Sequence, residues 1–255
     1  MQVYISTQQK KMQILKFDQL DSTNNYAKTL IQEGKAKDGQ VIYTLSQTAG
    51  RGQSSNSWES ELGKNLTFSL IIQPENIEPR HQFLISQAVS IGIVQYLKFL
   101  INNEFIHVKW PNDIYVGMKK IAGILIEHSV RDNQILFSVI GVGLNVNQTE
   151  FTKNAGNPTS LSLINKTQYD LKTELDEITT CIVNVLDSLQ FDGGENCRIQ
   201  YLEHLLFFNE MREYIVRGEK IIGKIIGINV FGFLQIQTEN GTILECDIKE
   251  IVYVM

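Results

Sequence analysis

Polar, glycine-containing runs interrupt the apolar segments of this sequence at four places where chemistry could be carried out. In the first, residues 48–58, Gly50 and Gly52 flank Arg51 between two strongly apolar segments. Glycine lets a backbone approach a ligand and offer its N–H groups, and an arginine beside it can meet a carboxylate or a phosphate. Taken alone, this run is equally consistent with a flexible surface loop.

Two further runs place a charged side chain at the border of an apolar strand. In KWPND (109–113), Asp113 could hold Mg²⁺, which favours carboxylates together with phosphate oxygens. In KIAG (120–123), Lys120 could be partly desolvated and paired with an anion, and Gly123 suggests a bulge or a close backbone approach. Without further context, an Asx turn and an ordinary edge lysine are the simpler interpretations.

The fourth run is GVGLNVN at 141–147. Two glycines weaken a strand, so we expect either a ligand or another strand to lie against this backbone. Asn145 could read an adenine edge, because its amide both donates and accepts hydrogen bonds. The sequence contains no GxxxxGK[ST] loop, and the glycines at 50 and 52 do not complete a dinucleotide fingerprint. Any ATP-binding site must therefore be built from other motifs.

Composition limits the classes of protein to which the chain can belong. Its 255 residues, 43% hydrophobic and 20% charged, can build a core without a disulfide or metal staple. A net charge of −5 without a long basic run argues against nucleic-acid binding. Three cysteines without CxxC spacing predict neither a disulfide framework nor a zinc site. The N-terminus lacks a signal peptide and the apolar segment 83–101 contains polar residues, so we expect a buried core helix and a cytoplasmic protein without membrane association.

The hydrophobic pattern predicts an α+β fold with a mixed or antiparallel sheet, because several strands follow one another without intervening helices. From about Tyr214 the chain is β-branched and glycine-punctuated, with an Asn-Gly hairpin signal at 240–241, which predicts a small β-barrel. We therefore expect a domain over 1–210 and a barrel over 211–255. Strands are expected at 12–17, 39–47, 65–73, 105–110, 113–117, 120–129 and 134–147, and helices at 24–33, 83–101, 173–190 and 195–209.

Together these runs resemble the biotin–protein ligases, whose motifs occur here in the family's order and spacing. The matching runs are DSTN (21–24), SQTAGRGQ with a following tryptophan (46–58), KWPNDIY (109–115), KIAGILIE (120–127) and GVGLNVN (141–147). The resemblance implies a class II synthetase-like catalytic domain followed by an SH3-like barrel.

The activity that the resemblance implies has two steps. Biotin and Mg·ATP form biotinyl-5′-adenylate, which then acylates one lysine on the carrier domain of a biotin-dependent carboxylase. A lipoate or octanoate ligase or transferase of the same fold is the alternative activity. A non-enzymatic ligand-binding module is a further alternative, against which the presence of Lys120 and Arg51 argues.

The resemblance also implies roles for individual residues. Lys120 is expected to contact the biotin carboxylate and the α-phosphate, and Arg51 to order the adenylate, which makes both catalytic. Asp113 is expected to hold the Mg²⁺ that accompanies ATP. The residues expected to bind biotin are Ser22, Thr23, Asn24, Gln47, Gly50, Arg51, Gly52, Lys120, Gly123 and Leu125. Those expected to bind ATP are Arg51, Gln53, Trp58, Asn112, Lys120 and Asn145.

The sequence departs from the common family pattern at Gln53, where many members carry a second arginine. Fewer cations then face the phosphates, and we expect Lys64 or another basic side chain to compensate. Because the DSTN run starts at Asp21, we expect no N-terminal DNA-binding domain and no repressor role. The sequence leaves a monomer and a homodimer equally open.

Overall fold

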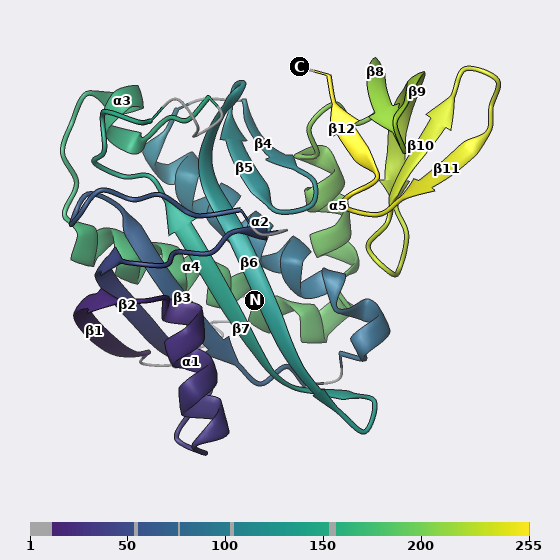
Figure 1. Cartoon of the computed structure of the whole chain (residues 1–255). Helices are drawn as coiled ribbons and strands as arrows, with labels where there is room; N and C mark the ends of the chain where they lie inside the picture. Colours follow the sequence, from purple (N-terminus) through teal and green to yellow (C-terminus); the bar gives the residue numbers. More distant parts are fainter. Residues whose placement is uncertain (1–11, 54–55, 76, 103–104, 153–156, 255) are drawn as a thin grey trace, which may run out of the picture.

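A mixed seven-stranded sheet forms the larger part of the computed structural model (Figure 1). Its strands are β1 (Gln13–Leu20), β2 (Gln40–Gln47), β3 (Leu66–Ile72), β4 (Ile106–Lys109), β5 (Asp113–Val116), β6 (Lys119–Arg131) and β7 (Gln134–Leu144), in the spatial order β1-β2-β3-β7-β6-β5-β4. The pair β1–β2 is parallel and the other neighbours are antiparallel, which confirms the predicted mixed sheet. The structure describes residues 12–53, 56–75, 77–102, 105–152 and 157–254.

Helices cover both faces of this sheet. Successive strand residues point to opposite sides of a sheet, so the continuous apolar run in β2 supplies core residues to both faces. On one face, α1 (Thr23–Gln32) packs Ala27 against Ile42 and its neighbours. On the other face, Val41 and Tyr43 join a larger core. Behind the sheet in Figure 1 lie α2 (Phe83–Leu100), preceded by the 3₁₀ turn η2 (Pro79–His81), α4 (Leu171–Asp192) and α5 (Glu195–Glu203).

The helix α2 is the buried core helix that the sequence predicts. The segment Pro79–Leu100 is long and apolar enough to cross a membrane, but 67% of its apolar window is buried inside the fold. It packs against both α4 and α5 and against strands β4 to β6. An apolar helix that is covered by protein on several sides is typical of the centre of a large core.

Gly92 lets α2 and α4 approach backbone to backbone. A Cβ atom at Gly92 would lie 2.6 Å from Ile182 Cα and 3.1 Å from Cys181 O. We expect Gly92→Ala to lower the free energy of unfolding by about 2 kcal/mol. Overpacking costs up to about 3 kcal/mol, and the higher helix propensity of alanine offsets about 1 kcal/mol of this.

Urea unfolding followed by circular dichroism measures this difference. Gly227→Ala is the matched control, because its Cβ would meet only the flexible Gln235 Oε1, at 3.4 Å. If Gly92→Ala and Gly227→Ala unfolded at the same urea concentration, the close α2–α4 contact would not limit packing.

The C-terminal part of the described chain forms a second, antiparallel sheet. Its strands are β8 (Met211–Val216), β9 (Glu219–Ile228), β10 (Leu234–Thr238), β11 (Ile243–Cys246) and β12 (Ile251–Tyr253), in the order β11-β10-β9-β8-β12. Asn240 and Gly241, with a φ of 85° at the glycine, form the predicted hairpin turn between β10 and β11. The predicted barrel is thus a five-stranded sheet with β11 and β12 at its edges, and the domain boundary at 210/211 stays a prediction.

Direct contacts join the two sheets. Trp110 Nε1 donates a hydrogen bond to Gly232 O at 3.0 Å. The segment before β8 also bonds to both sheets, since Leu206 N donates to Val108 O in β4 and Asn209 N donates to Ile225 O in β9, each at 2.9 Å. Buried residues of both parts belong to one continuous core. The strand β12 therefore lies beside the end of the larger sheet, near β4 and β5 (Figure 1).

Two helical segments differ from the sequence prediction. The helix predicted for 195–209 ends at Glu203, because Leu206 bonds to β4 and Phe207 and Asn209 adopt positive φ angles of 63° and 60°. A short helix, α3 (Leu161–Asn165), forms in a stretch for which the sequence predicted neither a helix nor a strand. Its N-cap is Ser160, whose side chain accepts a hydrogen bond from Leu163 N at 3.2 Å.

Candidate active site

A cavity of about 430 Å³ lies at the junction of the two sheets. This volume lies within the usual range for a pocket that holds a small ligand. Gly50 and Asn145 are the predicted site residues that do not line it. The predicted site residues that do line it are Ser22, Thr23, Asn24, Gln47, Arg51, Gly52, Gln53, Trp58, Asn112, Asp113, Lys120, Gly123 and Leu125.

Lys120 and Asp113 face each other in the cavity from β6 and β5. Lys120 Nζ lies 2.6 Å from Asp113 Oδ1, and both side chains are about three-quarters buried, with exposed fractions of 26% and 21%. The pairing of these strands shifts between Ile114 and Tyr115, which leaves one extra residue in β6. This bulge changes the alternation of β6, so Lys120 shares the cavity face with Gly123, whose Cβ would lie 3.5 Å from Lys120 Nζ.

The backbone of Lys120 is held on its other edge by a neighbouring segment. Lys120 N donates to Asn157 O at 3.0 Å, and Lys120 O accepts from Thr159 N at 2.8 Å. Asn145 supports the same segment, because its side chain donates to Thr159 O at 3.0 Å and is buried. Asn145 thus lies next to the support of Lys120, and its predicted contact with adenine stays a prediction.

The indole of Trp58 lies flat against two glycines of the sheet. A Cβ at Gly143 would lie 2.5 Å from Trp58 Cζ2, and one at Gly123 would lie 3.1 Å from Trp58 Cζ3. Lys120 Nζ sits 5.7 Å from the centre of the indole, within cation–π range. A side chain, rather than a ligand or a strand, therefore covers Gly143. Trp58 Nε1 is buried and has no hydrogen-bond partner among the described residues.

Buried polar groups line the opposite end of the cavity, at the start of α1. Thr23 N donates to Gln47 Oε1 at 2.9 Å, and the Ser69 hydroxyl donates to Asn24 Oδ1 at 2.6 Å. Gly141 makes room for Asn24, since a Cβ there would lie 3.0 Å from Asn24 Cγ and closer still to Oδ1. Neighbouring Ser22, the N-cap of α1, makes no capping hydrogen bond with its side chain and lines the cavity.

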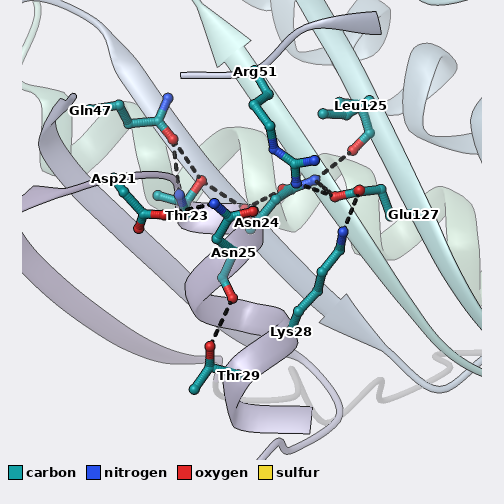
Figure 2. A network of polar contacts seen from close by, with 11 residues as sticks. Asp21, Thr23, Asn24, Asn25, Lys28, Thr29, Gln47, Arg51, Leu125 and Glu127 are labelled. Atoms are coloured by element: carbon teal, nitrogen blue, oxygen red, sulfur yellow. Dashed lines mark hydrogen bonds and ion pairs between the residues drawn. The ribbon is translucent and has the colours of Figure 1, made fainter. Parts of the chain in front are cut away.

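Arg51 is tied to the sheet through Glu127, as Figure 2 shows. Arg51 Nη2 donates to Glu127 Oε2 at 2.8 Å, and Asn24 Nδ2 donates to the same oxygen at 2.9 Å. Lys28 pairs with the other carboxylate oxygen. Burial works against ionisation of Glu127, but hydrogen bonds from Lys28, Asn24 and Arg51 more than offset it, so the pKa of Glu127 lies below its ordinary value.

Sequence reasoning assigned no role to Glu127, although it ends the KIAGILIE run. The available signal was the period of two in a strand, which puts Gly123, Leu125 and Glu127 on one face of β6. Asn24 Nδ2 also donates to Leu125 O at 3.2 Å, so the main chain of this face contributes as well. An acidic residue on the ligand face of a strand was therefore identifiable from spacing alone.

The C-terminal part of the chain contributes to the cavity in a way that no sequence signal indicated. Ile248, Lys249, Ile251 and Val252 line it. Arg51 and Lys120 are each paired with a carboxylate, whereas Lys249 has no ion pair within the described part of the chain. Lys64, the cation expected to compensate for Gln53, does not line the cavity.

Asp113 is the acidic residue that could hold a metal ion here. Among the described residues that line the cavity it is the only carboxylate, and no cluster of three or more potential metal ligands occurs in the described ranges. Mg²⁺ at nucleotide sites is usually held by one or two carboxylates with phosphate oxygens and water. Asp113 therefore fits an ion that enters with a nucleotide better than one held by the protein alone.

The cavity brings together three cations, those of Arg51, Lys120 and Lys249. Such an arrangement suits the joining of two anions, which needs positive charge and fixed orientation. The buried amide and hydroxyl groups near α1 suit a neutral polar head group, since each offers a donor or an acceptor in a fixed place.

Comparisons with known proteins show which family the chain resembles. Residues 16–145 match the model of the Biotin/lipoate A/B protein ligase family. A bifunctional ligase/repressor of Bacillus subtilis is 28% identical over 244 residues, covering 93% of this chain and 73% of that protein. A human biotin–protein ligase is 28% identical over 221 residues, 81% of this chain and 29% of its own length. The structure of the biotin protein ligase from Aquifex aeolicus in complex with biotin and ATP superposes with a TM-score of 0.77 at 25% identity, covering 94% of this chain and 97% of that one.

Proposed function

The chain belongs to the biotin/lipoate A/B protein ligase family, and we propose how this ATP-dependent biotin–protein ligase uses its cavity to activate biotin and pass it to a protein lysine. The observation that carries the proposal is that residues from separate segments, each expected at biotin or ATP, line one cavity. The buried Ser22–Asn24 end receives the ureido head, and the Lys120 end receives the carboxylate.

Lys120 and Arg51 act on the first bond that forms. The biotin carboxylate attacks the α-phosphorus of ATP, the bond to the leaving pyrophosphate breaks, and biotinyl-5′-adenylate results. Both reactants are anions, so a fixed ammonium and a fixed guanidinium lower the cost of bringing them together. Asp113 would hold the Mg²⁺ that accompanies the nucleotide, and that ion would supply further positive charge to the phosphates.

The second step transfers biotin to a carrier. The lysine amine of the carrier attacks the biotinyl carbonyl, AMP leaves with the electrons of the broken C–O bond, and the amine loses its proton. We propose the carrier domain of a biotin-dependent carboxylase as the acceptor, and the cytoplasm as the compartment. The three cysteines are free thiols in the structure, in keeping with a reducing compartment.

Lys249 supplies the positive charge that Gln53 does not. It lines the cavity, lacks an ion pair among the described residues, and so is available to the phosphates of ATP. We expect Lys249→Ala to raise KM for ATP roughly fivefold, the effect of losing a solvent-accessible ion pair of about 1 kcal/mol. Lys64→Ala, outside the cavity, is the control. Equal KM values for the wild type and Lys249→Ala would show that a group other than Lys249 supplies the positive charge that Gln53 lacks.

Release of pyrophosphate tests the function directly. The protein is incubated with ATP and Mg²⁺, and pyrophosphate is measured on addition of biotin or of lipoate. Biotin should stimulate release, and lipoate should not. Stimulation by lipoate alone would establish the alternative lipoate activity. If neither biotin nor lipoate stimulated the release of pyrophosphate, the proposed ligase chemistry would be excluded. Labelled biotin and a purified carrier domain then test the transfer step.

A further inference from the structure

Glu127 contacts three side chains, two that line the cavity and one that lies outside it (Figure 2). One oxygen of its carboxylate accepts from Arg51 and from Asn24, and the other pairs with Lys28. Glu127 itself does not line the cavity, whereas Arg51 and Asn24 do. Glu127 thus acts on the site through its partners and makes no contact with the cavity space.

Arg51 depends on this carboxylate more than Asn24 does. Asn24 keeps two other hydrogen-bond partners, Leu125 O at 3.2 Å and the Ser69 hydroxyl at 2.6 Å. The only ion pair of Arg51 within the described residues is with Glu127. The Arg51 side chain is 39% exposed, so without Glu127 little else fixes it. A long side chain left free loses the orientation that electrostatic stabilisation requires.

We propose that Glu127 is a positioning residue that holds the guanidinium of Arg51 at the cavity wall, with its remaining N–H groups available to the phosphates of ATP. Lys28, which lies outside the cavity, pairs with the other carboxylate oxygen and not with the one that accepts from Arg51. The kinetic part of this inference rests on the proposed function, and the structural part does not.

A double-mutant cycle tests the kinetic part. Glu127→Gln should raise KM for ATP about fivefold, the scale of a half-exposed ion pair. The dissociation constant for biotin without ATP should change by less than about twofold, because Asn24 keeps its other partners. In an Arg51→Gln background, Glu127→Gln should have no further effect on KM for ATP. A purely structural role would instead multiply the two effects, and would overturn the proposal.

Tryptic cleavage of the Arg51–Gly52 bond tests the structural part without any ligand. Trypsin must take the Arg51 side chain into its own pocket, so Arg51 has to leave Glu127 first. Glu127→Gln should speed this cleavage about fivefold, and Glu127→Asp, which keeps the charge but shortens the side chain, should also speed it. Lys28→Met should not, because it leaves the Arg51–Glu127 pair intact.

Glu33→Gln is the matched control, since it removes a carboxylate that pairs with Lys35 away from the cavity. Equal cleavage of Glu127→Gln, Glu127→Asp and the wild type would overturn the proposal, as would equal acceleration by Lys28→Met. If the wild type released no pyrophosphate with biotin, the proposed function would fail, and the cleavage rates would still decide the role of Glu127.

Discussion

Replacing Lys120 with alanine is expected to slow biotin-dependent pyrophosphate release by about 10²- to 10³-fold, the loss seen when one fixed charge-stabilising group is removed. Lys120 lies in the cavity, 2.6 Å from Asp113 and within cation–π range of Trp58. Its backbone is held on both edges, by β5 and by the segment at 157–159. The amine is therefore fixed before substrates arrive, which is the condition for a large effect.

Lys119→Ala is the matched control for this variant. Lys119 is the preceding residue in β6, carries the same charge, is exposed and does not line the cavity. It should leave the rate of release unchanged. A loss of less than about tenfold for Lys120→Ala, measured at saturating biotin and ATP, would show that other groups carry the charge stabilisation.

Gly141→Ala is expected to weaken biotin binding roughly 10- to 100-fold, which corresponds to an overpacking cost of about 1–3 kcal/mol. The new methyl group would occupy the place of the Asn24 carboxamide. Asn24 would then leave the Ser69 hydroxyl and the main chain of β6, and the end of the cavity proposed for the ureido head would lose its shape. Calorimetric titration with biotin, in the absence of ATP, measures the change.

Gly227→Ala again serves as the control, because a Cβ fits there without displacing a neighbour. Thermal unfolding of Gly141→Ala separates lost binding from lost structure. Biotin affinity equal to that of the wild type would place the ureido head away from Asn24.

The elements around the cavity could be predicted from sequence because their patterns are local. Alternating apolar residues identify the strands, and the helix predicted at 24–33 lies within one residue of α1 (Thr23–Gln32) at each end. The family and its ligase activity are confirmed by the comparisons, since the motifs that carry them are contiguous runs. The residue roles within those runs stay predictions.

Features that arise from packing between distant segments could not be predicted. Lys249 reaches the cavity only because β12 docks beside the larger sheet, and no local pattern encodes that approach. The single extra residue in β6 reverses which side Lys120 faces, and strand alternation alone would have put Lys119 there. Asn145 lies in a motif, yet its side chain is bonded to Thr159 O outside the cavity wall.

The contribution of residues 248–252 to the cavity wall has a consequence for how the enzyme is made. The α1 end of the cavity comes from residues near position 22, so residues far apart in the sequence build its two ends. The cavity is complete only after residues 248–252 have been translated and have packed beside the larger sheet, so a chain that ends before them lacks one wall of the cavity.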